Sequence, residues 1–124
     1  MQREWKACDM ENVKYQRGIN GSVGLYPYIR DNGYKMLFYS GTSDSLVPTQ
    51  GTQQWINELG WNVTEEWRPY FIQISPTTKQ VAGYVETRGN FTLATVHNGG
   101  HMAAKNKKVQ TYYAVFNFIN GIPL

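Results

Sequence analysis

Two stretches of the sequence decide the fold: Tyr39-Ser-Gly-Thr-Ser-Asp44-Ser-Leu-Val-Pro48 and Val96-His-Asn-Gly-Gly-His101-Met102. Each begins at the end of an apolar run, 36–39 in the first case and 91–96 in the second, and each contains a glycine turn. Nearly continuous apolar runs are typical of strands that are buried on both faces of a sheet. The pattern therefore predicts two buried strands, with Asp44 and His101 in the loops that leave them.

Asp44 and His101 form a candidate acid–base pair. A histidine acts as a general base only when its ring is held in one tautomer, and a carboxylate that accepts the Nδ1 proton holds it there. Hydrolases with the chain order Ser, Asp, His place the last two residues in loops after strands. The residues alone leave a second interpretation open, in which Asp44 caps the next helix and His101 is an ordinary loop histidine. No Gly-x-Ser-x-Gly sequence, which would carry a nucleophile, occurs in the 124 residues.

Several motifs, in their order along the chain, resemble the C-terminal part of the serine carboxypeptidases, a family of α/β-hydrolases. Residues 39–48 resemble the family's Tyr-Ser-Gly-Asp-x-Asp-x-x-x-Pro motif, and residues 98–102 resemble its Gly-x-Gly-His-Met-Val-Pro motif. Further resemblances are Trp5-Lys-Ala-Cys8, Trp67-Arg-Pro-Tyr70, Val81-Ala-Gly-Tyr-Val85 and Phe116-Asn-Phe118. Together they cover nearly the whole chain.

The resemblance implies a fold and a role. The fold is α/β, with residues 1–124 as the C-terminal part of an α/β-hydrolase domain: a mixed, mostly parallel sheet with an inserted hairpin and flanking helices. Asp44 and His101 would be two members of a Ser-Asp-His triad, and Met102 would line the pocket for the leaving residue. The serine would lie on an N-terminal part or large chain. The whole enzyme would remove the C-terminal residue of a peptide through an acyl-enzyme, without a cofactor, and this chain alone would be inactive.

The departures from the family pattern that bear on the site lie in the two loops and just after them, where residues 105–108 stand in place of the family's Asp and Pro. Thr42 stands where the family has the first Asp of Gly-Asp-x-Asp, and Ala103 and Ala104 stand where it has Val-Pro. The motif residues at the two triad positions are kept. The departures leave open the shape of the loop after His101 and of the substrate pocket.

Two alternatives to a peptidase remain open. Acyltransferases and hydroxynitrile lyases share the scaffold of this family, and the residues present do not separate them from peptidases. A truncated or duplicated, non-catalytic protein that keeps this half of the fold and binds a partner is the rival from another class. A Gly-x-Ser-x-Gly sequence upstream of Met1 would favour the enzyme.

One cysteine and three glycosylation sequons bear on the compartment. The resemblance implies that Cys8 forms a disulfide with the missing part, and the alternative is a buried free thiol. The sequons begin at Asn20, Asn62 and Asn90. They predict a glycoprotein and support the secretory location that the resemblance implies, lysosomal, vacuolar or extracellular. Residues 1–6 are too polar for a signal peptide, so the signal is expected on the missing part.

Charge and spacing argue against other kinds of site. The net charge is +3, and the one basic cluster, residues 105–108, fits a solvated helix face better than a nucleic-acid interface. No apolar run is long enough to span a membrane. His97 and His101 are four positions apart, but the Asn-Gly-Gly between them breaks a helix and no third ligand is evident. The sequence therefore predicts no metal site.

The remaining pattern predicts the other elements. Helices are expected over residues 23–30, 48–59 and 105–120, because turn or capping residues bound them and the last has apolar residues at helical spacing. Strands are expected over residues 35–40, 70–74, 80–87 and 91–96, the middle two joined by Ser75-Pro-Thr-Thr78 as a hairpin. Residues 1–17 are expected to be irregular and residues 61–69 to be a connection.

Overall fold

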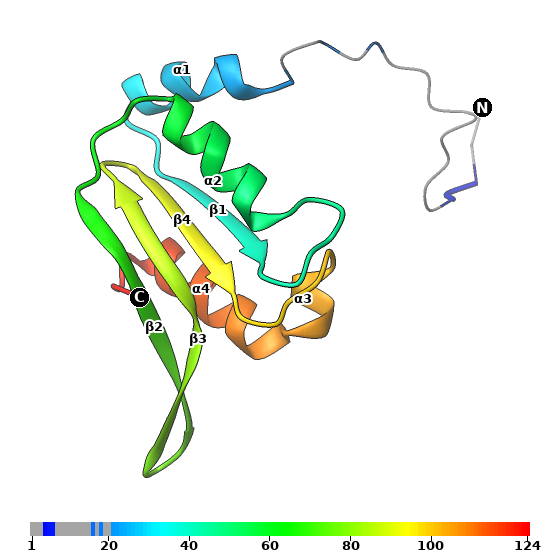
Figure 1. Ribbon diagram of the computed structural model, residues 1–124, viewed down its shortest axis with the longest axis vertical. Helices are drawn as coiled ribbons and strands as arrows, with labels where there is room; N and C mark the ends of the chain where they lie inside the picture. The colour runs from blue at the N-terminus through cyan, green and yellow to red at the C-terminus, as the bar shows by residue number, and fades with distance from the viewer. Residues whose placement is uncertain (1–3, 7–15, 17, 19–20) are drawn as a thin grey trace.

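The described part of the chain has four strands, which form one sheet (Figure 1). The computed structural model describes residues 4–6, 16, 18 and 21–124; Cys8 and Asn20 lie outside these residues. The strands are β1 (Met36–Gly41), β2 (Glu65–Ser75), β3 (Thr78–Arg88) and β4 (Phe91–Val96), in the spatial order β1-β4-β3-β2. β1 and β4 are parallel, whereas β4–β3 and β3–β2 are antiparallel.

The expected α/β architecture with a mixed sheet is confirmed, with one correction. A mostly parallel sheet is not what these four strands make, because two of the three pairings are antiparallel. Short turns join β2 to β3 and β3 to β4, and strands joined by a short turn can only run antiparallel. The hairpin, β2 and β3, is therefore an antiparallel part of the same sheet.

The register of β1 against β4 positions the two candidate residues. The parallel pairing runs from Met36 opposite Phe91 to Gly41 opposite Val96. Both strands consequently end at the same edge of the sheet. The loops that carry Asp44 and His101 leave from that edge, as the sequence predicts.

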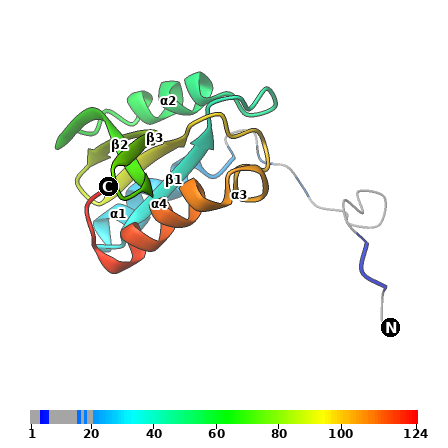
Figure 2. The ribbon, with the colours of Figure 1, turned by 90° about the horizontal axis from the view of Figure 1, so that it is seen from below.

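Helices cover both faces of the sheet. A short 3-10 helix (Val23–Leu25) leads into α1 (Tyr26–Asp31), α2 (Thr49–Glu58) follows β1, and α3 (Ala103–Asn106) and α4 (Lys108–Asn120) follow β4. In Figure 2, α2 lies on one face and α4 on the other, so the molecule has three layers. The single helix expected over residues 105–120 is broken at Lys107, whose φ of −132° and ψ of 57° are not helical.

Alternate residues of β1 and β4 supply two separate cores. The core under α2 contains Phe91, Leu93 and Ile56, with Phe38 and Trp55 packed against it. The core under α4 combines three alanines with larger side chains: Tyr70, Ile72, Ala82, Val85, Ala94 and Ala114. The period of two along each strand sends neighbouring side chains to opposite layers.

β2 begins earlier than the sequence predicts. Residues 61–69 were expected to be a connection, but β2 starts at Glu65, and Pro69 lies within it opposite Tyr84. Proline has no N–H to donate, so it is tolerated in a strand only where no ladder bond is needed, as at the edge of a sheet. β2 is such an edge strand in the described sheet.

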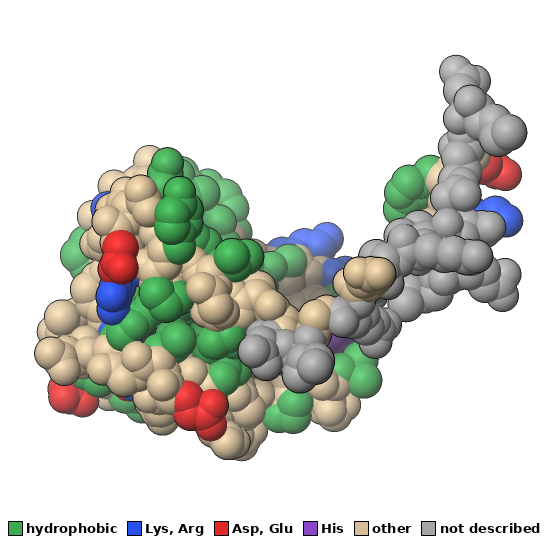
Figure 3. All heavy atoms as spheres, turned by 90° about the horizontal axis from the view of Figure 1, so that it is seen from above, with side chains coloured by type: hydrophobic (Ala, Val, Ile, Leu, Met, Phe, Trp, Pro, Cys, Tyr) green, Lys and Arg blue, Asp and Glu red, His purple; other side chains and the backbone are tan. Residues whose placement is uncertain are grey.

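The described surface is varied in character. Figure 3 shows apolar side chains in several groups on the face seen from above, with acidic and basic side chains scattered between them. Within residues 21–124 and the few described before them, no helix has the length and apolar character needed to cross a bilayer.

Candidate active site

The loop after β1 holds the carboxylate of Asp44 in one orientation. Its Oδ1 accepts hydrogen bonds from the backbone N–H groups of Leu46 and Val47, at 2.8 and 3.1 Å. A short acidic side chain that bonds to the backbone two or three residues later is a common way to shape a turn. Oδ1 of Asp44 therefore shapes the turn before α2, and the second oxygen, Oδ2, remains available to another partner.

A glycine allows the two loops to touch. A Cβ atom at Gly41 would overlap the backbone carbonyl groups of Gly99 and Gly100. The N–H of Ser43 donates to the carbonyl of Gly99 at 2.8 Å. Only a residue without a side chain permits this close approach between the end of β1 and the loop after β4.

A sharp turn brings His101 back over the sheet edge. Asn98 has a φ of 53°, the left-handed region that Asn tolerates better than most residues. Gly99 follows, and its N–H donates to the carbonyl of Val96 at 3.0 Å, closing the turn. His101 thus lies between the end of β4 and the start of α3.

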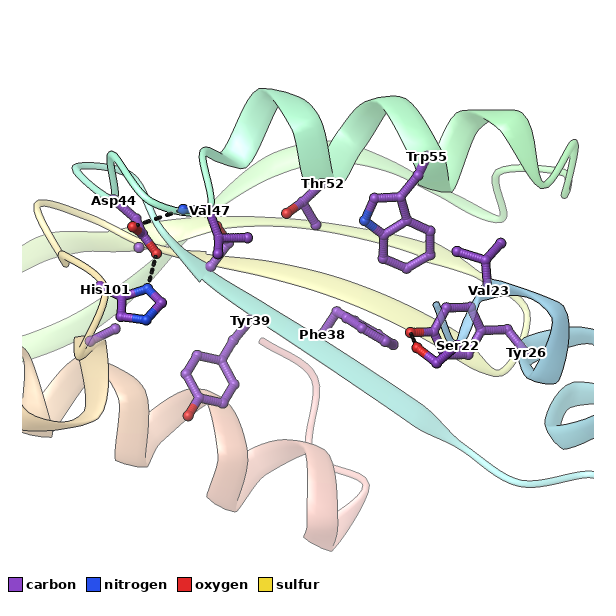
Figure 4. Close-up of a pocket in the computed structure, with 13 residues that line it drawn as sticks. Ser22, Val23, Tyr26, Phe38, Tyr39, Asp44, Val47, Thr52, Trp55 and His101 are labelled. Atoms are coloured by element: carbon purple, nitrogen blue, oxygen red, sulfur yellow. Dashed lines mark hydrogen bonds and ion pairs between the residues drawn. The ribbon is translucent and has the colours of Figure 1, made fainter. Parts of the chain in front are cut away.

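The two side chains meet as the sequence predicts (Figure 4). Nδ1 of His101 lies 3.0 Å from Oδ2 of Asp44. The Asp44 side chain is 8% exposed and the His101 side chain is 54% exposed. A carboxylate only accepts hydrogen bonds, so Nδ1 is the donor and carries the proton. The other ring nitrogen, Nε2, points away from Asp44 and has no hydrogen-bond partner among the described residues.

Hydrogen bonding keeps Asp44 ionised. Burial raises the pKa of its carboxyl, but hydrogen bonds from the Val47 N–H, from His101 and from the Leu46 N–H outweigh burial. The pKa of Asp44 therefore lies below its ordinary value of 3.8. A carboxylate that stays charged at neutral pH can orient a neighbouring imidazole and stabilise its protonated form.

A hollow of about 480 Å³ lies beside this pair. At the Asp44–His101 end its walls include polar residues. At the other end they include three aromatic rings, from Phe38 of β1, Tyr26 of α1 and Trp55 of α2 (Figure 4). Ser22 lies at the other end, where its hydroxyl bonds to that of Tyr26 at 2.7 Å. No serine hydroxyl in the described part of the chain is hydrogen bonded to His101.

The other predicted residues that the structure describes do not line the hollow. Met102 is 59% exposed and stands just before α3, and it does not line the hollow. Asn62 and Asn90 are exposed. Among the described residues, no three His, Cys, Asp or Glu side chains cluster as metal ligands would.

One residue of the site was not predicted. The hydroxyl of Thr42 accepts a hydrogen bond from the N–H of Asn98 at 2.9 Å. The sequence marks Thr42 only as a departure from a motif. Its contact depends on two loops far apart in the chain, so no local pattern could have indicated it.

Comparisons with known proteins agree on one family. The family model for serine carboxypeptidases matches residues 1–121. Serine carboxypeptidase-like 17 of Arabidopsis thaliana is 41% identical over 123 residues, which are 98% of this chain and 26% of that protein. Serine carboxypeptidase-like 11 of the same plant is 38% identical over 122 residues, 98% of this chain and 27% of that protein.

A solved structure agrees on the fold. The crystal structure of a prohormone-processing carboxypeptidase from Saccharomyces cerevisiae superposes with a TM-score of 0.68 at 19% sequence identity. The match covers 82% of this chain and 22% of the yeast chain. The present chain thus spans about a quarter of the length of the curated relatives it matches.

Proposed function

The chain belongs to the serine carboxypeptidase family, and on that premise we propose that it supplies two members of a Ser-His-Asp triad. Asp44 orients His101, and a serine outside these 124 residues is the nucleophile. The observation that carries the proposal is the 3.0 Å contact between Nδ1 of His101 and Oδ2 of Asp44, which leaves Nε2 free. Nucleophile activation in triads depends on this arrangement of base and orienting acid.

The proposed reaction removes the C-terminal residue of a peptide in two steps. First, Nε2 of His101 takes the proton from the serine hydroxyl, whose oxygen attacks the last peptide carbonyl. The amide bond breaks as His101 gives that proton to the leaving amine, and an ester links the serine to the remaining peptide. Second, His101 takes a proton from water, which attacks the ester. The serine regains its proton and the shortened peptide leaves.

The partner in this proposal is the serine-bearing part of the same enzyme, in one polypeptide or as a separate large chain. The relatives are about four times longer than this chain, which leaves room for that part. Among the described strands, β1 has a neighbour on one side only, and its free edge carries unpaired backbone groups. A strand of the serine-bearing part would complete the sheet there.

Side chains next to the free edge of β1 support the same docking. Four exposed apolar residues share one face of α4: Val109, Tyr112, Phe116 and Ile119. A groove of about 280 Å³ separates this helix from Tyr39 of β1 and is lined in part by Thr111. The buried hydroxyl oxygen of Thr111 has no hydrogen-bond partner in the described part of the chain. That oxygen is enclosed by this chain's own atoms, so the support for docking comes from the apolar face of α4 and the groove.

Labelling with a serine-directed phosphonylating reagent tests the proposal. The chain by itself is expected to remain unlabelled and to cleave no peptide, because loss of the nucleophile alone removes nearly all triad catalysis. With the serine-bearing part present, one serine of that part is expected to be labelled and a blocked dipeptide to be cleaved. His101→Ala should then abolish both.

Three outcomes would contradict the proposal. Labelling of a serine within the 124 residues would place the nucleophile in this chain. Undiminished cleavage by His101→Ala in the joined enzyme would remove His101 from the reaction. Absence of labelling in the joined, folded protein would favour the non-catalytic alternative.

A secretory location, lysosomal, vacuolar or extracellular, is part of the proposal. Two sequon asparagines, Asn62 and Asn90, are exposed and follow α2 and β3 at the sheet end opposite His101. Glycans there would leave the site open. Protein made in a secretory host should lose mass with an endoglycosidase, and Asn62→Gln and Asn90→Gln should each remove part of that loss. Cys8 is proposed to form a disulfide to the serine-bearing part, so reduction should separate the two when they are separate chains.

A further inference from the structure

We propose that Thr42 is a positioning residue, whose hydroxyl holds the turn that carries His101 at the distance Asp44 requires. The proposal rests on the function proposed above. Thr42 is the first residue beyond the last parallel pair of the sheet, Gly41 opposite Val96. Past this pair the two strands become loops, and their backbones no longer form a regular ladder.

Thr42 continues the connection between the strands by two hydrogen bonds. Its backbone N–H donates to the carbonyl of Val96 at 3.0 Å. Its side-chain Oγ1 accepts from the N–H of Asn98 at 2.9 Å. In a continued parallel ladder the carbonyl of Thr42 itself would accept the N–H of Asn98, so the hydroxyl takes the place of that carbonyl. Thr42 thus bonds to both residues that flank His97 in the chain, Val96 and Asn98.

Asn98 is the residue where a fixed backbone matters most. Its φ of 53° is the one left-handed value among the described non-glycine residues, and it begins the turn toward His101. A left-handed conformation persists only where surrounding contacts determine it. The bond from its N–H to Thr42 is such a contact. Without that bond the turn would relax, and the imidazole would move relative to the carboxylate.

The tight contact between the loops makes the site sensitive to such movement. Gly41 touches the carbonyls of Gly99 and Gly100 with no room for a Cβ atom. A shift of one loop is therefore transmitted to the other. Displacements of about 1 Å in reacting groups are enough to lower rates by about 100-fold. Loss of a single bond to an exposed threonine should have a smaller effect of the same kind.

The test compares Thr42→Val, which keeps the shape without the hydroxyl, with Thr42→Ser, which keeps the hydroxyl. In the enzyme with its serine-bearing part, Thr42→Val should lower kcat by about 10-fold or more with little change in KM, since orientation rather than binding is lost. Thr42→Ser should restore most of kcat. Ser45→Ala is the matched control, because it removes an exposed hydroxyl of the same loop for which no hydrogen bond is found among the described residues.

Hydrogen exchange supplies a readout that is independent of catalysis. The Asn98 amide should exchange faster in Thr42→Val than in the parent protein, and at the parent rate in Thr42→Ser. If Thr42→Val does not fold, Thr42→Ala replaces it with the same expectation. Equal loss of kcat in Thr42→Ser and Thr42→Val, or parent values of both kcat and exchange in Thr42→Val, would overturn the role of the hydroxyl. Retained activity in His101→Ala would instead overturn the proposed function itself.

Discussion

Nδ1 of His101 lies 3.0 Å from Oδ2 of Asp44, although 57 positions of sequence separate the two residues. The contact exists because β1 and β4 are parallel neighbours that end at the same edge. Hydrogen bonds from Leu46 and Val47 fix the carboxylate, and a left-handed turn at Asn98 returns the chain to it. The geometry of the pair is thus a property of the sheet as much as of the loops.

Replacing Asp44 by Asn should show that Asp44 orients the His101 ring and does not contribute to substrate binding. An amide can donate to Nδ1 and so favour the wrong tautomer, which in a serine protease triad lowers kcat by about 10⁴-fold. In the enzyme with its serine-bearing part, Asp44→Asn should lower kcat to a similar degree and leave KM within a few-fold. Asp31→Asn, which alters an exposed carboxylate of α1, is the control and should leave both unchanged.

Stability should depend on pH through Asp44. Its folded pKa lies below 3.8, so the unfolded chain takes up the proton first as the pH falls. The stabilising contribution is present above pH 3.8 and is lost as the pH falls through the folded value. Urea denaturation between about pH 6 and pH 2 should show the parent protein losing its advantage over Asp44→Asn in acid. A constant difference across this range would contradict the assignment.

The pKa of Glu65 is also lowered, chiefly by its hydrogen bond to Arg68, so Glu65→Gln should remove a further part of the acid dependence.

The buried hydroxyl of Tyr70 should contribute measurably to stability. The residue is 1% exposed, and its hydroxyl donates to the carbonyl of Thr95 at 2.7 Å. Tyr70→Phe removes the donor and leaves a buried carbonyl with one partner fewer, which should lower the free energy of unfolding by about 1–2 kcal/mol. Tyr34→Phe, at a site that is 65% exposed, should change it by less than about 0.5 kcal/mol. Chemical denaturation of both variants measures the difference.

Two glycine substitutions should have opposite effects on stability. A Cβ at Gly83 would overlap the carbonyl of Thr95 and crowd the Tyr70 ring, so Gly83→Ala should destabilise by about 3 kcal/mol or more. A Cβ at Gly51 meets nothing within 4 Å, and this residue lies inside α2. Gly51→Ala should therefore stabilise by about 0.5–1 kcal/mol, because alanine loses less backbone entropy in a helix. Midpoints of urea unfolding report both, and a stabilising Gly83→Ala would show that the sheet adjusts there.

Much of the site was predictable because its signals are local. The apolar run 91–96 predicts the bounds of β4, and the strand expected over residues 35–40 matches β1 to within one residue at each end. Strand, glycine turn and polar residue recur at both candidate positions, so the pairing of Asp44 with His101 follows once the strands are taken as parallel neighbours. The resemblance to a known family decided between a triad pair and the alternative, a helix-capping aspartate with an ordinary loop histidine.

Elements that depend on distant contacts were harder to predict. Glu65, Glu66 and Pro69 interrupt any strand pattern, yet β2 forms because β3 provides a partner and the edge tolerates the proline. The break at Lys107 divides a helix that its apolar spacing predicts as continuous. The hydroxyl of Thr42 acquires a role only when the loop after β4 lies against it. In each case tertiary contacts override local preference.

The position of the β2–β3 hairpin has a consequence for how this protein can be altered. In Figure 1 the hairpin extends well past the ends of β1 and β4, and its tip, Pro76–Thr77, is exposed. The hairpin lies between Asp44 and His101 in the sequence, but its tip projects away from both. Extra residues at the tip would therefore lengthen only the projecting end of the hairpin. An affinity tag or a fluorophore inserted there would leave the distance between Asp44 and His101 unchanged. The tip is also a place where relatives could differ in length.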